Sequence, residues 1–139
     1  MTQVSLIILG WGLGRSGAYG LVVLFEKFNN WRIERKPDFK ADLGHQFVWY
    51  LREANESVAW NFVEATDRTL ELLRRQPLLG RRRRFRHPLL VGLRSFRVEP
   101  PFNRFLIFYR ADDGVVDAWR LMHGGRDLSR RLVEPPSVD

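Results

Sequence analysis

The fold of this chain is decided by residues 103–132, NRFLIFYRADDGVVDAWRLMHGGRDLSRRL. In residues 105–110, Phe, Ile and Tyr take every second position, which is the period of a β-strand. Residues 115–123 are again rich in strand formers. The Asp113-Gly114 pair between them predicts a tight turn, because glycine adopts a positive φ without steric cost. The stretch therefore predicts a β-hairpin followed by a histidine, two glycines and a short basic helix.

Two amphipathic helices are predicted upstream of this hairpin. The first begins at Pro37, since proline suits the first turn of a helix. Its apolar stripe consists of Phe39, Leu43, Phe47, Tyr50 and Leu51. The second is capped by Asn55 or Ser57 and runs to about Arg75. Its inner face consists of Ala59, Phe62, Val63, Thr66, Leu70 and Leu73. The break between them is so short that the helices must form an antiparallel hairpin.

The remaining strands complete an α+β domain. A short strand is predicted at residues 31–35, and three consecutive strands at 91–99, 103–110 and 115–123 form an antiparallel meander. Pro100-Pro101 provides its first turn. The expected order is β-α-α-β-β-β with a short C-terminal helix, and the helix hairpin packs on a small, mainly antiparallel sheet.

Composition limits the classes of function. The chain has 139 residues, enough for one domain, and a net charge of +7. Only three of its 23 basic residues are lysine, so 20 are arginine. Such a protein expects a polyanionic or acidic partner. It has no cysteine, which excludes disulfides and thiolate metal sites and suits the cytoplasm. We expect no metal and no cofactor.

Residues 1–29 differ from the rest because they are apolar and rich in glycine. They contain a G-x-G-x-x-G pattern at 12–17, typical of dinucleotide binding, and an apolar run at 4–25 long enough to span a membrane. No βαβ alternation follows the glycines, and a charge interrupts the run. We interpret 1–29 as an extension, either poorly ordered or translated upstream of the true start, residues 30–134 as the domain and 135–139 as a tail.

Five motifs carry a resemblance to a known family. They are KPDFKADL, NESVAWNFVEATDRTLELLRRQPLLG, GLRSFRV, NRFLIFYRADDG and WRLMHGGRDL. In this order they resemble the ParE branch of the ParE/RelE superfamily over residues 31–133. The resemblance implies the toxin of a type II toxin–antitoxin pair, which arrests growth and is neutralised by a cognate antitoxin. ParE-like toxins are associated with poisoning DNA gyrase, and RelE-like relatives cut messenger RNA on the ribosome.

The nuclease alternative needs a general acid, a general base and cations beside the phosphate. The candidates are His123 and Tyr109 for proton transfer and Arg94, Arg97 and Arg110 for the phosphate. The RelE-like nucleases are similar in carrying a dense lysine–arginine cluster with a C-terminal tyrosine, and this chain departs from that pattern. We therefore expect a protein-binding toxin without catalytic residues of its own, with endoribonuclease activity as the alternative.

Two binding surfaces follow from this interpretation. The expected contacts with gyrase are Arg120, His123, Arg126, Arg130 and Arg131. The expected contacts with the antitoxin are Phe47, Tyr50, Leu51, Phe62, Arg83 and Arg84. The last two belong to RRRRFRHPLL, residues 81–90, where five arginines occupy six positions. We first interpret this run as a solvated loop, and next as a contact for the antitoxin or the target.

Overall fold

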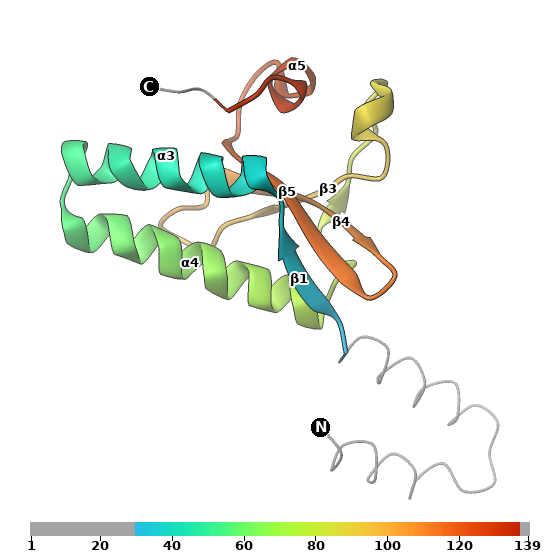
Figure 1. The fold of residues 1–139 in the computed structure, drawn as a ribbon, viewed down its shortest axis with the longest axis horizontal. Helices are drawn as coiled ribbons and strands as arrows, with labels where there is room; N and C mark the ends of the chain where they lie inside the picture. The colour runs from blue at the N-terminus through green and yellow to red at the C-terminus, as the bar shows by residue number, and fades with distance from the viewer. Residues whose placement is uncertain (1–29, 137–139) are drawn as a thin grey trace, which may run out of the picture.

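The computed structural model describes residues 30–136 (Figure 1). The N-terminal extension with its glycine pattern and the last three residues lie outside the described part. The elements are β1 (Arg32–Arg35), α3 (Pro37–Glu53), α4 (Glu56–Arg75), β2 (Arg81–Arg82), a 3₁₀ turn η1 (Pro88–Leu90), β3 (Arg94–Arg97), β4 (Phe105–Asp112), β5 (Val115–His123) and α5 (Leu128–Val133). Within residues 30–136, no helix is long and apolar enough to cross a lipid bilayer.

The strands form one five-stranded sheet in the order β1-β5-β4-β3-β2. Strand β1 is parallel to β5, and every other pairing is antiparallel. The predicted α+β fold is thereby confirmed. Two predicted segments differ most from the structure. The predicted loop at 81–90 contains β2 and η1, because Arg81 and Arg82 pair with β3. The predicted strand at 91–99 is shorter, since its first residues follow η1 through Gly92 with a φ of 82°.

The helix hairpin forms as predicted. Helix α3 starts with Pro37 in its first turn, and α4 is capped by Asn55, whose side chain accepts a hydrogen bond of 2.9 Å from the N–H of Val58. This cap satisfies one of the N–H groups that the start of a helix leaves unpaired. The two helices lie side by side over one face of the sheet (Figure 1).

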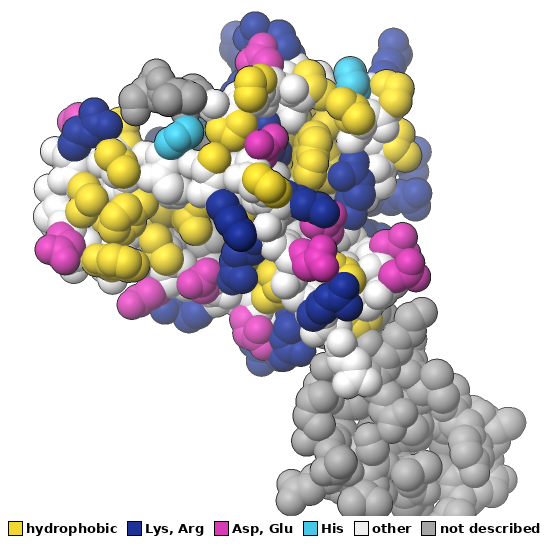
Figure 2. Space-filling view, in the orientation of Figure 1, with side chains coloured by type: hydrophobic (Ala, Val, Ile, Leu, Met, Phe, Trp, Pro, Cys, Tyr) yellow, Lys and Arg dark blue, Asp and Glu magenta, His cyan; other side chains and the backbone are white. Residues whose placement is uncertain are grey.

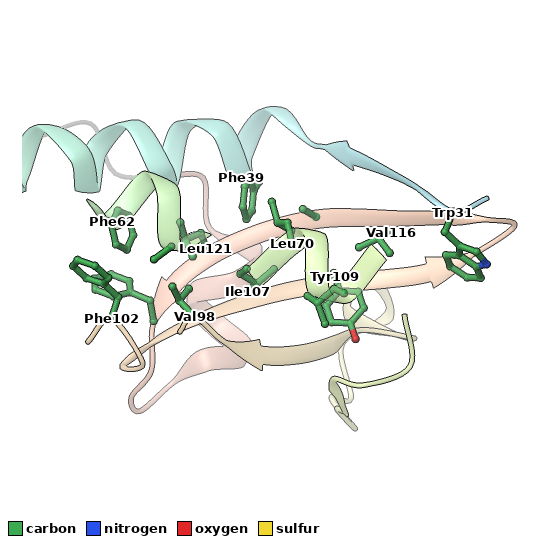
Figure 3. Close-up of a cluster of buried hydrophobic side chains, with 14 residues drawn as sticks. Trp31, Phe39, Phe62, Leu70, Val98, Phe102, Ile107, Tyr109, Val116 and Leu121 are labelled. Atoms are coloured by element: carbon green, nitrogen blue, oxygen red, sulfur yellow. The ribbon is translucent and has the colours of Figure 1, made fainter. Parts of the chain in front are cut away.

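The main core lies between the hairpin and the sheet (Figure 3). Phe39 from α3 and Leu70 from α4 lie near Ile107 of β4, and Phe62 from α4 lies beside Phe102. The side chains of Phe39, Phe62, Leu70, Ile107 and Tyr109 are fully buried. A smaller cluster covers the opposite face of the sheet and joins Leu90, Leu93, Phe108 and Leu132. The central strand β4 is thus covered on both faces, which explains its nearly continuous apolar sequence.

Strand β1 is shorter than β5 and pairs only with residues Val115 to Ala118. Beyond this point α3 takes the place of a strand beside β5. The backbone N–H of Leu121 donates a 3.0 Å hydrogen bond to the carboxylate of Asp42 on α3. A side chain therefore satisfies a strand donor that would otherwise be left unpaired. This contact fixes α3 against the end of the sheet that leads into the C-terminal segment.

Candidate functional site

The free end of the helix hairpin carries an exposed apolar surface. Its members, which we call the tip patch, are Val48, Trp49, Leu51 and Trp60, and each is between 40% and 52% exposed. Figure 2 shows hydrophobic side chains gathered over this end of α3 and α4. The ring of Trp60 meets that of Phe47 edge to face, with centroids 4.8 Å apart. Exposed apolar patches of this kind are typical of protein-interaction sites.

The expected antitoxin contacts on the hairpin divide into two groups. Leu51 lies in the tip patch, and Phe47 and Tyr50 are half-buried beside it. Phe62 was misplaced among the surface contacts, because it is completely buried and packs against Phe102 and Phe105. The sequence prediction missed Trp49 and Trp60. Their position outside the predicted apolar stripes was the signal, since large aromatic residues on a polar helix face have no core to enter.

A groove separates α3 from the C-terminal segment. Its lining includes Asp42, His45, Arg52, Glu53, His123, Arg131 and Glu134. His123 is exposed, its Nδ1 lies 2.9 Å from the carbonyl oxygen of Gly124, and its ring meets that of Phe105 edge to face. Two histidines, His45 and His123, therefore line the same groove. No local pattern predicts this, since the two histidines are 78 positions apart and only the packing of α3 on β5 brings the two segments together.

The expected gyrase contacts also divide. Arg126 and Arg130 are exposed, and Arg131 is half-buried with a 3.3 Å hydrogen bond to the carbonyl oxygen of His123. Arg130 lies 3.6 Å from the carboxylate of Glu134, a weak surface pair. We call Arg126, Arg130 and Arg131 the C-terminal arginines. Together with His123 they form a basic surface on the C-terminal segment.

Arg120 does not belong to that surface, which corrects the expectation. Its side chain is 2% exposed and forms a two-pronged ion pair with Asp42, at 2.7 and 3.0 Å. The same guanidinium donates to the carbonyl oxygens of Leu132 and Glu134, at 3.2 and 2.6 Å. A buried guanidinium is tolerated only when its donors are satisfied in this way. Arg120 joins β5, α3 and the end of α5 from inside the protein.

Tyr109 is completely buried, and its hydroxyl is used structurally. The hydroxyl donates to the carbonyl oxygen of Pro77 and accepts from the N–H of Gly80, both at 2.8 Å. Burial raises the pKa of Tyr109 above its usual value. Arg94 donates to the carbonyl oxygen of Gly80 at 3.0 Å. Arg110 donates to the carbonyl oxygens of residues 89 and 91.

These positions do not bring the predicted nuclease residues together. His123 is paired with Phe105 across the β4–β5 ladder, whereas Tyr109 is paired with Ala118. Four residues along β4 separate the two pairs, or about 13 Å at the usual rise of a strand. Tyr109 also faces the core, away from solvent. A catalytic pair of His123 and Tyr109 is therefore not formed.

The arginine run at residues 81–86 lies at the edge of the sheet. Arg84 is exposed, and Arg83 is half-buried, donates to the hydroxyl of Ser95 at 3.3 Å and lies over the ring of Phe85. Across residues 30–136, no group of three or more histidine, aspartate or glutamate side chains is arranged to hold a metal ion.

The chain is similar to one family of known proteins in both sequence and fold. A family model described as "ParE toxin of type II toxin-antitoxin system, parDE" matches residues 33–128, more than half of the chain. A similar solved structure is the "Chromosomal ParDE TA system from P. aeruginosa", with 17% identity and a TM-score of 0.57. The match covers 69% of this chain and 98% of that chain, and at this identity it concerns the fold. No curated protein matches the chain significantly.

Proposed function

The chain belongs to the family of ParE toxins of type II toxin–antitoxin systems, and on that premise we propose that it inhibits DNA gyrase in the cytoplasm and is neutralised by a cognate antitoxin. Family membership is the observation that carries the proposal. The dispersal of His123, Tyr109 and the strand arginines supports it, because a protein-binding inhibitor needs no assembled proton-transfer pair.

The basic C-terminal surface is the proposed contact with gyrase. The C-terminal arginines and His123 lie on or next to α5, a helix of only six residues with a single buried side chain, Leu132. So short a helix has little stability of its own. Its position depends on the hydrogen bonds that Arg120 donates to its last carbonyl groups. Arg120 thus acts as a positioning residue for the contact surface.

The tip patch and the arginine run are the proposed contacts with the antitoxin. The tip patch lies at the free end of the hairpin, and Arg83 and Arg84 lie at the β2 edge of the sheet, so the two surfaces are at different ends of the domain (Figure 1). A partner that covers both must be extended, as antitoxin segments that wrap a toxin would be. Covering the tip patch would also remove exposed apolar area from water.

The groove between α3 and the C-terminal segment supports one second candidate. His45 and His123 line it together with Arg52 and Arg131, which supplies two imidazoles and two cations on one concave surface. Ribonuclease chemistry needs groups of this kind. No hydrogen bond connects the two imidazoles within the described residues. If the chain cuts messenger RNA, this groove is where the cleavage would occur.

Two parallel assays test the proposal. Purified toxin is added to a gyrase supercoiling reaction and to a cell-free translation reaction. We expect supercoiling to be inhibited and messenger RNA to stay intact. Charge reversal at Arg126 and Arg130 should weaken the inhibition, and Arg75→Glu on α4 is the matched control. Cleaved messenger RNA with normal supercoiling would refute the proposal, and loss of cleavage in H45A and H123A would then assign the groove.

A further inference from the structure

Three hollows in the surface share His123, which ends β5. One is the groove between α3 and the C-terminal segment. A second, which we call the aromatic pocket, has a volume of about 470 Å³, and its lining includes Trp49, Tyr50, Phe102, Phe105, Arg104 and His123. The third, which we call the basic hollow, includes Arg97, Arg104, His123 and Gly124. The aromatic pocket and the basic hollow have Arg104 and His123 in common, so together they form one site with an apolar part and a cationic part.

The walls of the aromatic pocket come from α3, from the turn before β4 and from β4 itself. Phe102 and Phe105 are buried, whereas Trp49 is 52% exposed. The ring of Tyr50 meets those of Trp49 and Phe102 edge to face, with centroids 5.3 and 5.7 Å apart. Figure 3 shows Phe102 beside Phe62, so the base of the pocket continues into the main core. Inclined rings of this kind form a cup that suits a further aromatic side chain.

The basic hollow supplies positive charge beside these rings. Arg97 and Arg104 are exposed, and neither side chain pairs with a carboxylate in the described part of the chain. The backbone N–H of Gly124 donates a 2.7 Å hydrogen bond to the carbonyl oxygen of Arg104, which ties the turn before β4 to the end of β5. The backbone of Arg104 is therefore fixed, while its guanidinium stays available for an anion.

We propose that this site binds an aromatic side chain of gyrase together with an adjoining carboxylate. The inference rests on the proposed function, because it identifies the kind of segment that the toxin recognises on its target. The ring enters the aromatic pocket, where apolar area is removed from water. The carboxylate pairs with Arg104 or Arg97. The site is continuous with the proposed gyrase contact, because His123 lines both the pocket and the groove that contains Arg131.

A nucleotide is the other occupant that could combine a ring with an anion. Its phosphate would suit the arginines, but its base would stack on the flat face of an aromatic ring. The ring pairs in contact along the pocket meet at angles between 51° and 85°. None of these pairs could hold a base between parallel faces, and this geometry favours the side chain.

A dipeptide probe tests the site without gyrase. Acetyl-phenylalanyl-aspartate is titrated into the isotope-labelled full chain, and binding is followed by NMR. We expect the indole N–H of Trp49 and the amides of Gly124 and Gly125 to shift, while the indole N–H of Trp60 stays as the internal reference. Acetyl-alanyl-aspartate should bind about tenfold more weakly, because a buried aromatic anchor carries most of the affinity at such a site. Acetyl-phenylalanyl-asparagine should bind about threefold more weakly, since it lacks the carboxylate.

Variants of the full chain connect the site to gyrase. Arg104→Ala should weaken binding of the dipeptide several-fold, and Arg75→Ala, the matched control, should leave it unchanged. In the supercoiling assay, Trp49→Ala and Arg104→Ala should each weaken inhibition about tenfold. Leu89→Ala removes a similarly exposed apolar side chain outside the site and should inhibit like the wild type. Trp49 and Arg104 are exposed, so both variants should fold, which circular dichroism checks.

Each outcome decides a different point. Equal binding of the phenylalanine and alanine dipeptides, or wild-type inhibition by W49A and R104A, would overturn the site and leave gyrase inhibition standing. Tighter binding of adenosine monophosphate than of the dipeptide would overturn the side chain as occupant. Absence of inhibition by the wild type would overturn the proposed function and, with it, gyrase as the source of the segment. The dipeptide titration contains no gyrase, so its result would still decide the site.

Discussion

Replacing Arg120 by methionine should destabilise the protein more than any surface substitution. The guanidinium is 2% exposed, and it binds both carboxylate oxygens of Asp42 as well as backbone carbonyl groups at the end of α5. The R120M variant leaves a nearly buried carboxylate with only the N–H of Leu121 as partner. Breaking one half of a buried pair costs about 3–5 kcal/mol. At roughly 4 °C per kcal/mol for a domain of this size, the melting temperature should fall by about 12–20 °C.

The assay is urea unfolding of four proteins: wild type, R120M, D42N and the double variant. D42N should cost less than R120M, because the guanidinium keeps its carbonyl partners. The double variant should be more stable than the sum of the single effects predicts, since no uncompensated charge remains. Arg130→Met, an exposed residue, is the control and should change stability by less than about 0.5 kcal/mol. A cost below about 1 kcal/mol for R120M would refute the assigned role.

Three further predictions concern the hairpin and its junction with the sheet. Gly80→Ala should cost about 1–3 kcal/mol in urea unfolding, because a Cβ at this position would lie 2.6 Å from Cε1 of buried Tyr109. Asn55→Ala should cost about 1 kcal/mol through loss of the α4 cap, while Asn55→Asp stays close to wild type. Tyr109→Phe should cost about 1–3 kcal/mol, since the N–H of Gly80 and the carbonyl of Pro77 lose their partner. The pKa of Tyr109 in the folded protein is raised above the unfolded value near 10. The free energy of unfolding that this group contributes is therefore complete below pH 10 and is lost as the pH rises further. In Y109F, the free energy of unfolding should decline less steeply at alkaline pH.

Each of these has a result that contradicts it. Wild-type stability of G80A would mean that Tyr109 can move, and equal stability of N55A and N55D would exclude the cap. An identical alkaline decline in Y109F and wild type would assign that decline to other groups.

The sequence predicted the parts of the fold that depend on local signals. The stripe of α3, the Asn55 cap and the Asp113-Gly114 turn each act within a few residues. Both ends of β5 were predicted correctly, because the Asp113-Gly114 turn precedes the strand and two glycines follow it. Strand β2 was missed, since an arginine pair becomes a strand only through pairing with β3.

The candidate site was less predictable, because its residues meet through tertiary packing. Arg120 looked like a surface residue because arginine is almost never fully buried unless paired. Its partner, Asp42, is 78 positions away, and nothing local connects the two. Phe62 was also predicted to be on the surface, although it is buried. The apolar stripe of a helix does not predict which of its residues are exposed at the end of a helix hairpin.

Strand β5 sits between β1 and β4, and this has a consequence for synthesis on the ribosome. Strand β1 can pair only after Val115 to Ala118 have emerged from the ribosome. Helix α5 is held in place only after Arg120 can donate to the carbonyl oxygens of Leu132 and Glu134. A chain released early therefore lacks the strand that closes the sheet and the segment with the basic surface. Translation products that stop before residue 132 should therefore lack the proposed contact with gyrase.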